Sequence, residues 1–514
     1  MSLLKATAIF GSFTMISRIL GFIRDILMAA VLGAGAITDC FVVAFKLPNF
    51  FRRLFAEGAF SASFVPIFSA TLEKDGREEA IKFAEEAFAC LAITLLLFVG
   101  LIEIFTPALI YTIANGFTGD EAKFTLAVTL TRFTFPFILF VSLVSLLAGV
   151  LNSLGKFAET AATPIILNIC LISALLYASE MMATPAHTLA IAVSIAGFLQ
   201  LIFLYRACIK AGYRVRIKMP QLTPRVKKLL IIMGPAALGA GVIQLNLLLD
   251  MIIASHLPDA SMSYLYYADR LNQLPVGVIG VALGTVLLPY LSRSIASGNE
   301  EQVMRRQNNA IEMGLFLTIP AAVAFIIVPT DLIHVLLERS NFSAEATAQT
   351  SLTLAAYAAG LPAYVLAKVF VPGYFARGDT KTPLKFAVVA LVVNVSLNLI
   401  LMQYYAHVGL AMATAISAWL NVFMLAGGLV HRGHYQIERA VMIRLSKYVL
   451  CSIIMGAVVW AVQIQVHPLI EGGLGAQISG LLILVFSGIG SYLIATFLTK
   501  TIKKDELRAL FSKR

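Results

Sequence analysis

Runs of about 20 consecutive apolar residues recur along the whole of this 514-residue chain, and this feature restricts its fold more than any other. A helix of about 20 residues spans the roughly 30 Å hydrocarbon core of a bilayer. Hydrophobic residues make up 59% of the chain and charged residues only 13%, and the mean hydropathy is +0.87. No water-soluble domain of this length would tolerate such a composition. The chain is therefore built for a membrane.

We predict an all-α polytopic membrane protein with about 14 transmembrane helices, one for each apolar run. The first run starts after five residues and continues past residue 25 without a small-residue cleavage site, so we expect a first span and not a removable signal peptide. The runs lie near residues 6–30, 36–56, 84–113, 124–152, 158–180, 186–206, 229–254, 263–291, 309–328, 351–375, 384–402, 407–430, 446–463 and 476–499.

The positive charges gather in alternate loops. The net charge is +11, and residues 206–228 alone carry eight Lys and Arg and no acid, whereas the loops near 179–187, 255–262, 403–406 and 464–475 carry neither Lys nor Arg. By the positive-inside rule, the basic loops face the cytoplasm and both termini lie on that side. A nucleic-acid partner is not expected, because no compact basic domain carries these charges.

A weak internal repeat appears at an offset near 223 residues. AFKLPNFF (44–51) resembles ADRLNQLP (268–275), and three later pairs follow in the same order at nearly the same offset. The alternative is that apolar segments with occasional Pro and Gly align by chance. We expect two parallel six-helix lobes plus two C-terminal helices. The predicted parts are an N-lobe (1–210), a basic cytoplasmic linker (211–228), a C-lobe (229–430), and two extra spans with a basic tail (431–514).

Charged residues interrupt the first two spans and the eighth. A central Arg or Lys in a membrane helix costs roughly 2.5–3.5 kcal/mol, so each needs a partner or a wet cavity. In the second span Asp39, Lys46 and Arg53 recur every seven residues and share one helical face, with Asn49 and Glu57 beside it. Their alternative roles are ion pairs that fix helix packing, or residues at a span end that extend to the interface.

The first span carries Ser17 and Arg24 on one face, while Arg18 lies about 120° round the helix and lines up with Asp25. In the eighth span Ser263 and Arg270 share a face. The repeat offset matches Arg270 to Lys46, so both halves would bring a cation to one cavity. The planar guanidinium group favours a phosphate or a carboxylate, because it binds two oxygens at once and stays charged.

Other chemistries find little support in the sequence. The five cysteines are scattered through apolar runs, with no C-x-x-C and no histidine at metal-ligand spacing. Neither an H-E-x-x-H motif, an Asp-rich metal motif nor a Ser/His/Asp set on loops is present. A membrane enzyme such as a lipid-phosphate transferase is therefore disfavoured, and we expect no cofactor. These sequence patterns do not distinguish a transporter from a scaffold protein that binds the same ligand without transporting it.

Four segments carry a resemblance to a known family. These are SRILGFIRD (17–25), TDCFVVAFKLPNFFRRLFAEGAFSASFVPIFS (38–69), YYADRLNQLPVGVIGVALGTVLLP (266–289) and GDTKTPLK (378–385). The chain resembles the MviN/MurJ lipid II flippases of the multidrug/oligosaccharidyl-lipid/polysaccharide exporter superfamily, from Met1 to the C-terminus. The resemblance implies a flippase of the bacterial cytoplasmic (inner) membrane that moves the undecaprenyl-diphosphate-linked peptidoglycan precursor to the periplasmic leaflet by alternating access.

The resemblance also implies roles for individual residues. The substrate diphosphate would be bound by Arg18, Arg24 and Arg270. The family's two additional C-terminal spans, thought to form a groove for the lipid tail, resemble residues 446–463 and 476–499. The other polar cavity or gate residues fall on Ser17, Asp39, Lys46, Asn49, Arg52, Arg53, Glu57, Ser263 and Asp269.

The energy source stays open between two alternatives. The resemblance implies a sodium site between spans seven and eleven, as in some family members, and this site would fall on Asp250, Asn394, Asn398 and Thr414. The membrane potential alone offers about 2.3 kcal/mol per charge per 100 mV to a cationic cavity. Expected partners are lipid II, membrane lipids and cell-wall synthesis proteins. The alternative functions are a related lipid-linked oligosaccharide exporter and a drug/cation exporter, although the excess of cavity cations would repel a cationic drug.

Overall fold

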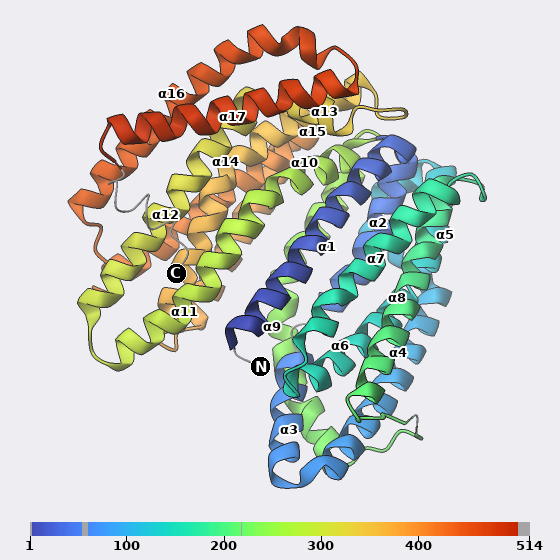
Figure 1. Ribbon diagram of the computed structural model, residues 1–514. Helices are drawn as coiled ribbons and strands as arrows, with labels where there is room; N and C mark the ends of the chain where they lie inside the picture. Colours follow the sequence, from blue (N-terminus) through green and yellow to red (C-terminus); the bar gives the residue numbers. More distant parts are fainter. Residues whose placement is uncertain (1–2, 54–59, 217, 502–514) are drawn as a thin grey trace. The chain divides into compact units, whose positions relative to one another are not determined.

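The computed structural model describes residues 3–53, 60–216 and 218–501, and no β-strand occurs in these ranges (Figure 1). The predicted all-α class is therefore confirmed. Ten described helices are long and apolar enough to cross a membrane, which agrees with a multi-pass protein. The predicted number of fourteen spans stays a prediction, because length and composition alone do not count spans.

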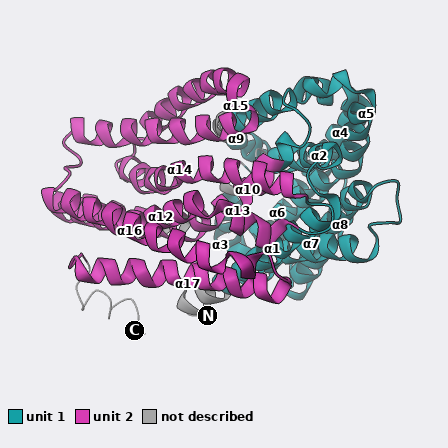
Figure 2. Ribbon diagram, turned by 90° about the horizontal axis from the view of Figure 1, so that it is seen from above, with its two compact units in different colours: residues 1–263, 339–342 teal, residues 264–338, 343–514 magenta. Residues whose placement is uncertain are grey.

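The chain forms two compact units, coloured separately in Figure 2. Unit 1 comprises residues 1–263 and 339–342, and unit 2 comprises residues 264–338 and 343–514. The helices that lie wholly in unit 1 are α1 (Leu3–Leu32), α2 (Ala36–Arg52), α3 (Ser61–Lys74), α4 (Gly76–Ile113), α5 (Glu121–Thr134), α6 (Phe137–Ser153), α7 (Phe157–Tyr177), α8 (Pro185–Lys210) and α9 (Pro224–Ser255), with the 3₁₀ turn η2 (Asn115–Gly119).

Helix α10 (Ser261–Pro275) starts in unit 1 and continues into unit 2. The compact units thus differ from the predicted division, which assigns residues 229–254 to the C-lobe. The compact units are defined by spatial contacts, whereas the predicted lobes are defined by an internal sequence repeat. The two duplicated lobes therefore stay a prediction. The rest of unit 2 consists of the π-turn η3 (Val276–Gly280), α11 (Val281–Ala296), α12 (Glu300–Ile327), α13 (Pro329–Leu337), α14 (Ala344–Phe375), α15 (Lys381–His431), α16 (Arg439–Ile470) and α17 (Leu474–Leu498).

Two short helices differ from the predicted runs. Helices α3 and α13 occupy segments that the apolar pattern leaves as loops. A hydropathy pattern detects long apolar runs, so short helices escape it. The predicted loop at 403–406 coincides with a sharp break inside α15, where Ala406 has a φ of 46°.

Polar caps begin several helices where loops end. The Asp120 side chain accepts hydrogen bonds from the first-turn amides of α5, and Thr223 does so for α9. Asn299 and Ser343 cap α12 and α14 in the same way. Each cap satisfies a backbone N–H that the helix itself leaves unpaired.

Each unit has its own apolar core. In unit 1, the ring of Phe64 stacks on Phe68 and Phe83, with ring centres 5.6 and 5.4 Å apart, and this cluster joins α3, α4, α6 and α8. In unit 2, one core lies among α11, α12, α14 and α15, and a second lies where α16 and α17 pack beside α12. These cores hold the polar clusters described below in place.

The predicted basic linker is attached to unit 1 by ion pairs. Arg225 contacts Glu79 at 2.7 Å and Asp75 at 3.0 Å, at the start of α4. Lys218 pairs with Glu85, whose carboxylate is buried. The acidic first turns of α4 therefore neutralise part of the positive charge that dominates the linker sequence.

The connection after α1 depends on Gly33. Its φ of +68° is left-handed, and a Cβ placed there would lie 2.2 Å from the carbonyl oxygen of Asn341. Asn341 in turn donates its backbone N–H to Ala30 at 3.2 Å and its side-chain amide to Val31 at 2.6 Å. These contacts hold residues 339–342 in unit 1, although their sequence neighbours belong to unit 2.

We expect Gly33→Ala to destabilise the protein. A left-handed backbone costs a residue with a Cβ about 1–2 kcal/mol, and displacing the Asn341 segment adds to this cost. The control is Gly35→Ala, because no atom lies within 4 Å of a Cβ at that position. Thermal unfolding of the detergent-purified variants measures the difference. Equal transition temperatures would contradict the proposed contact.

Candidate functional site

Arg24 lies buried in the first span and is paired with its neighbour in sequence. Its Nε and Nη2 donate to Asp25 Oδ1 at 3.0 and 2.7 Å, and its Nη1 donates to Asn168 Oδ1 on α7 at 3.0 Å. The Asn168 amide then donates to the backbone oxygen of Ser17 at 2.9 Å. Three of the predicted first-span residues, Ser17, Arg24 and Asp25, thus meet in one polar network between α1 and α7.

Arg18 and Asp25 both lie on the continuous helix α1, seven residues apart, and Asp25 pairs with Arg24. The Asp25 carboxylate is turned to Arg24, while Arg18 is exposed on α1. Helical spacing locates the point where each side chain leaves the backbone, but a long Arg side chain bends round the helix to the nearest acceptor. Asn168 was not predicted, because an isolated Asn in an apolar run gives no spacing signal.

Asp39 is a buried gate residue whose carboxylate accepts several hydrogen bonds. It is 1% exposed, and its Oδ1 accepts hydrogen bonds from the Ser263 backbone N–H at 2.9 Å and from the Ser263 hydroxyl at 2.6 Å. Its Oδ2 accepts from the Ala260 N–H at 2.9 Å. The predicted residues Asp39 and Ser263, 224 positions apart, therefore meet at the first turn of α10.

Lys123 completes this cluster and was missed by the sequence reasoning. Its Nζ lies 3.5 Å from Asp39 Oδ2 and 2.6 Å from Asp259 Oδ1, and it lies 4.2 Å from the centre of the Phe117 ring. The side chain is 6% exposed. Burying a lysine costs free energy unless the ammonium group is paired. The sequence signal that could have identified Lys123 is a cation at the start of an apolar run.

The polar face of the second span divides among different surroundings. Asn49 and Arg52 line a pocket in unit 1, and the Arg52 Nε donates to Asn49 Oδ1 at 3.2 Å. Lys46 is half-buried and Arg53 is exposed. The heptad spacing of Asp39, Lys46 and Arg53 therefore does not give them a shared environment. Glu57 lies outside the described residues.

The eighth-span residues Asp269 and Arg270 belong to unit 2. The Arg270 guanidinium lies 4.7 Å from the centre of the Tyr266 ring, which is a cation–π distance. Asp269 accepts a hydrogen bond from the side chain of Gln273, one turn further along the helix. Both side chains are half-buried.

The residues of the candidate sodium site fall in both units. In unit 2, Asn398 donates to Asn394 Oδ1 at 3.2 Å, and Asn394 donates to the Ser417 hydroxyl at 3.3 Å. Thr414 donates to the Leu410 carbonyl of its own helix. Asp250 belongs to unit 1, where it accepts from Asn246 at 3.2 Å. Buried amide oxygens are suitable ligands for a hard cation, and sodium binding stays a prediction.

An apolar groove of about 430 Å³ lies beside the two C-terminal spans. Helix α12 forms one wall, and α16 and α17 contribute Met455, Val459, Leu484 and Tyr492. Its lining is almost entirely hydrocarbon and aromatic. Such a groove suits an apolar chain and offers little to a charged ligand.

The GDTKTPLK segment forms a capped turn. Asp379 Oδ1 accepts the Thr382 N–H at 2.9 Å, and Arg432 donates to Asp379 Oδ2 at 2.6 Å. Hydrogen bonds from Thr382 and Arg432 hold the pKa of the Asp379 carboxyl below its usual range. These contacts account for the motif's residues by local structure.

Comparison with known proteins decides the family. The family model "Lipid II flippase MurJ" matches residues 28–475. The chain belongs to the MurJ family. A protein of Rhizobium tropici named a probable lipid II flippase MurJ is 42% identical, and the match covers 97% of this chain and 94% of that protein. Membership of this family confirms the predicted resemblance and the multi-pass membrane class.

Solved structures agree with this membership. A lipid II flippase MurJ in an inward closed conformation matches with a TM-score of 0.81 and 29% identity, over 95% of this chain and 98% of that one. An inward-facing multidrug resistance MATE family transporter of the MOP superfamily matches with a TM-score of 0.65 over 86% of this chain and 98% of its own, at 14% identity. The second likeness shows a shared fold only.

We expect Asp39→Asn to destabilise the protein by about 2–4 kcal/mol. An amide has one acceptor oxygen where the carboxylate has two, so its NH₂ would face N–H donors from Ala260 and Lys123. Asp75→Asn is the control, because Asp75 and its partner Arg225 are 47% and 35% exposed and a surface pair contributes about 0–1 kcal/mol. Thermal unfolding in detergent compares the two. Similar losses for both variants would show that Asp39 is not the centre of the cluster.

Proposed function

We propose that this chain translocates lipid II, the undecaprenyl-diphosphate-linked peptidoglycan precursor, from the cytoplasmic to the periplasmic leaflet. The match of the MurJ family model to residues 28–475 carries this proposal. Buried charges inside apolar helices support it, because a diphosphate head group crosses hydrocarbon only where protein groups replace its water. The lipid tail would stay in or beside the bilayer during transport.

Arg18, Arg24 and Arg270 would bind the diphosphate. Arg24 has the strongest local support, since its guanidinium is buried and already bonded to two oxygen-bearing side chains. Asp25 would neutralise Arg24 while no substrate is bound, and phosphate oxygens would compete with Asp25 for the same N–H groups. A charge-assisted contact of this kind contributes about 1.5–3 kcal/mol.

Asp39 and Ser263 would act as a gate during alternating access. Four donors on α5 and around the start of α10 meet at the Asp39 carboxylate, so separating these elements exposes a charge that needs new partners. Glu57 and Asp269 would pair with cavity cations in the other state. The Asp39→Asn and Asp75→Asn variants also test this role, since only the first should change the populations of the open and closed states.

The protein would lie in the bacterial cytoplasmic membrane with both termini in the cytoplasm. The basic loops, including residues 206–228, support this orientation. The apolar groove along α12, α16 and α17 would hold part of the polyprenyl tail, in line with its hydrocarbon lining. Further partners would be membrane lipids and cell-wall synthesis proteins.

The chain would act as a transporter and not as an enzyme, and it would bind no nucleic acid. A related lipid-linked oligosaccharide is the alternative cargo, because the same cations suit any polyprenyl diphosphate. The MATE-like fold keeps a drug or cation exporter as a second alternative. The cations of the first two spans oppose that function, since they repel a positively charged substrate.

Transport would be driven by sodium or by the membrane potential. The amides of Asn394 and Asn398 together with Asp250 and Thr414 would supply oxygen ligands to sodium. The membrane potential would instead act on the charged cavity itself, at about 2.3 kcal/mol per charge per 100 mV.

We expect Arg24→Ala to lower transport by roughly 10- to 100-fold, because charge-assisted hydrogen bonds to the diphosphate are lost. The assay uses cells depleted of their own flippase and an added enzyme that cleaves lipid-linked precursor exposed on the periplasmic face. The control is Arg206→Ala, because Arg206 is exposed near the end of α8. Failure of the wild-type chain to restore exposure would contradict the function, whereas full activity of Arg24→Ala would contradict only the diphosphate site.

For sodium coupling, we expect transport into vesicles to rise with a sodium gradient and Asp250→Ala to abolish that dependence. A potassium gradient at matched membrane potential is the control. Transport that ignores sodium in the wild type, with Asp250→Ala unchanged, would leave the membrane potential as the driving force.

A further inference from the structure

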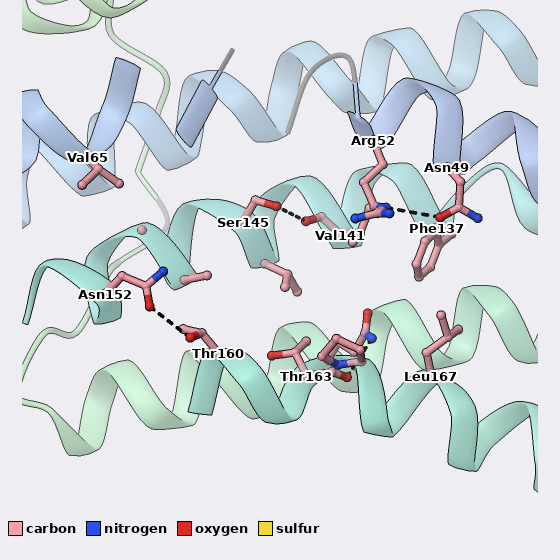
Figure 3. Close-up of a pocket in the computed structure, with 15 residues that line it drawn as sticks. Asn49, Arg52, Val65, Phe137, Val141, Ser145, Asn152, Thr160, Thr163 and Leu167 are labelled. Carbon is pink, nitrogen blue, oxygen red and sulfur yellow. Dashed lines mark hydrogen bonds between the residues drawn. The ribbon is translucent and has the colours of Figure 1, made fainter. Parts of the chain in front are cut away.

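A pocket of about 470 Å³ with a mixed polar and apolar lining lies in unit 1 (Figure 3). It is enclosed by α2, α3, α6, α7 and α8, and its lining differs in chemistry from the charged clusters of the first span. Among the fifteen lining residues there are three amides, three hydroxyls and one guanidinium, and none of the fifteen is acidic. These seven polar residues are Asn49, Arg52, Ser145, Asn152, Thr160, Thr163 and Gln200.

Each of the three hydroxyl groups of this pocket already donates a hydrogen bond to another group of the protein. Ser145 donates to the Val141 carbonyl at 3.1 Å, and Thr163 donates to the Glu159 carbonyl at 3.1 Å. Thr160 lies 3.0 Å from Asn152 Oδ1, as Figure 3 shows. Each hydroxyl oxygen keeps lone pairs after donating. The three hydroxyl oxygens therefore present lone pairs along α6 and α7, and the Asn152 amide adds N–H donors on α6.

Gln200 adds a buried acceptor on α8. The side chain is 3% exposed, and its Nε2 donates to the Thr163 carbonyl at 2.9 Å. Its Oε1 is buried and has no hydrogen-bond partner among the described residues. An unpaired carbonyl inside a membrane helix is costly, so this oxygen requires a donor that the described residues do not supply.

Arg52 on α2 is the one charged residue among the fifteen described residues that line the pocket. Its Nε donates to Asn49 Oδ1 at 3.2 Å, and Asn49 donates to the Phe45 carbonyl of its own helix at 2.8 Å. Figure 3 shows both side chains extending from α2 toward α6. A guanidinium here provides a donor for one carbonyl group of a ligand.

This combination selects a ligand that brings several O–H or N–H donors and at least one carbonyl. An N-acylated sugar has that pattern, with hydroxyl and amide donors for Gln200 and the threonines and an acyl oxygen for Arg52. A bare diphosphate lacks C–OH and N–H donors, and it would meet the lone pairs of the lining. The volume lies within the usual range for small-ligand pockets.

We infer that this pocket binds an N-acylated sugar of the transported head group and so selects the substrate by its sugar. The inference rests on the proposed function. The proposed orientation supports it, because α2 ends and α7 begins at this pocket, on the side assigned to the cytoplasm. The diphosphate would then bind to the first-span arginines, separately from the sugar.

The test measures binding to purified protein in nanodiscs with three lipids. These are a polyprenyl diphosphate, the same lipid with an N-acetylated disaccharide, and the disaccharide lipid with its peptide. The variants are Gln200→Met and Thr163→Val, which keep side-chain volume and remove pocket acceptors. The control is Thr188→Val. Thr188 lies on α8, as Gln200 does, but it is outside the pocket and donates to the Ala178 carbonyl.

We expect both pocket variants to weaken binding of the two sugar lipids by about tenfold and to leave the bare diphosphate lipid unchanged. The control should match the wild type with all three lipids. Wild-type affinity should also fall when the sugar lacks its acyl group. A thermal unfolding curve for each variant separates lost binding from lost folding.

Three results would overturn the inference. Equal weakening for all three lipids would indicate a structural role, and unchanged binding in both variants would exclude the pocket from recognition. Weakening only for the peptide-bearing lipid would assign the pocket to peptide. If the wild type bound none of the lipids, the proposed function would fall together with this inference. If the wild type bound them and only the variants behaved otherwise than expected, the proposed function would stand.

Discussion

The cost of placing polar groups in hydrocarbon governs this structure. The protein is mostly apolar helix, so every charge or amide within it must be bonded or must face a wet or ligand-binding space. Arg24 is bonded to Asp25 and Asn168, and Lys123 is bonded to Asp39 and Asp259. These two clusters place charged groups among mostly apolar helices. The head group of a transported lipid would interact with charged groups of this kind.

The polar groups of unit 1 fall into three chemical environments. The Arg24 network offers a cation already balanced by an acid. The Asp39 cluster is an anion held by donors from distant parts of the chain. The pocket lined by Gln200 and Arg52 has one cation and no acid among its lining residues, together with amide and hydroxyl groups. A lipid-linked substrate has matching parts, namely a charged diphosphate and an uncharged sugar, and separate environments allow each part to be recognised by different chemistry.

Family membership and local geometry support the functional proposal in different ways. The family model covers residues 28–475 and identifies the kind of protein, but it does not explain any single contact. The contacts in turn explain why charged residues are tolerated in membrane helices. The GDTKTPLK segment carries part of the family resemblance, and its contacts show a structural role. Asp379, Thr382 and Arg432 form a turn held by hydrogen bonds among their own side chains and the backbone.

Much of the architecture follows from sequence alone. Apolar runs and loop charges specify a polytopic helical membrane protein, and helical spacing singles out Arg24, Asp39 and Ser263 as unusual. Those properties are local, since hydropathy and periodicity act within one helix. The partners required the tertiary structure. Asp39 meets Ser263 across 224 positions, Asp25 binds Arg24 and not Arg18, and the Gln200 pocket combines five helices. Contacts between distant segments depend on how helices pack and how side chains bend, which no local pattern records.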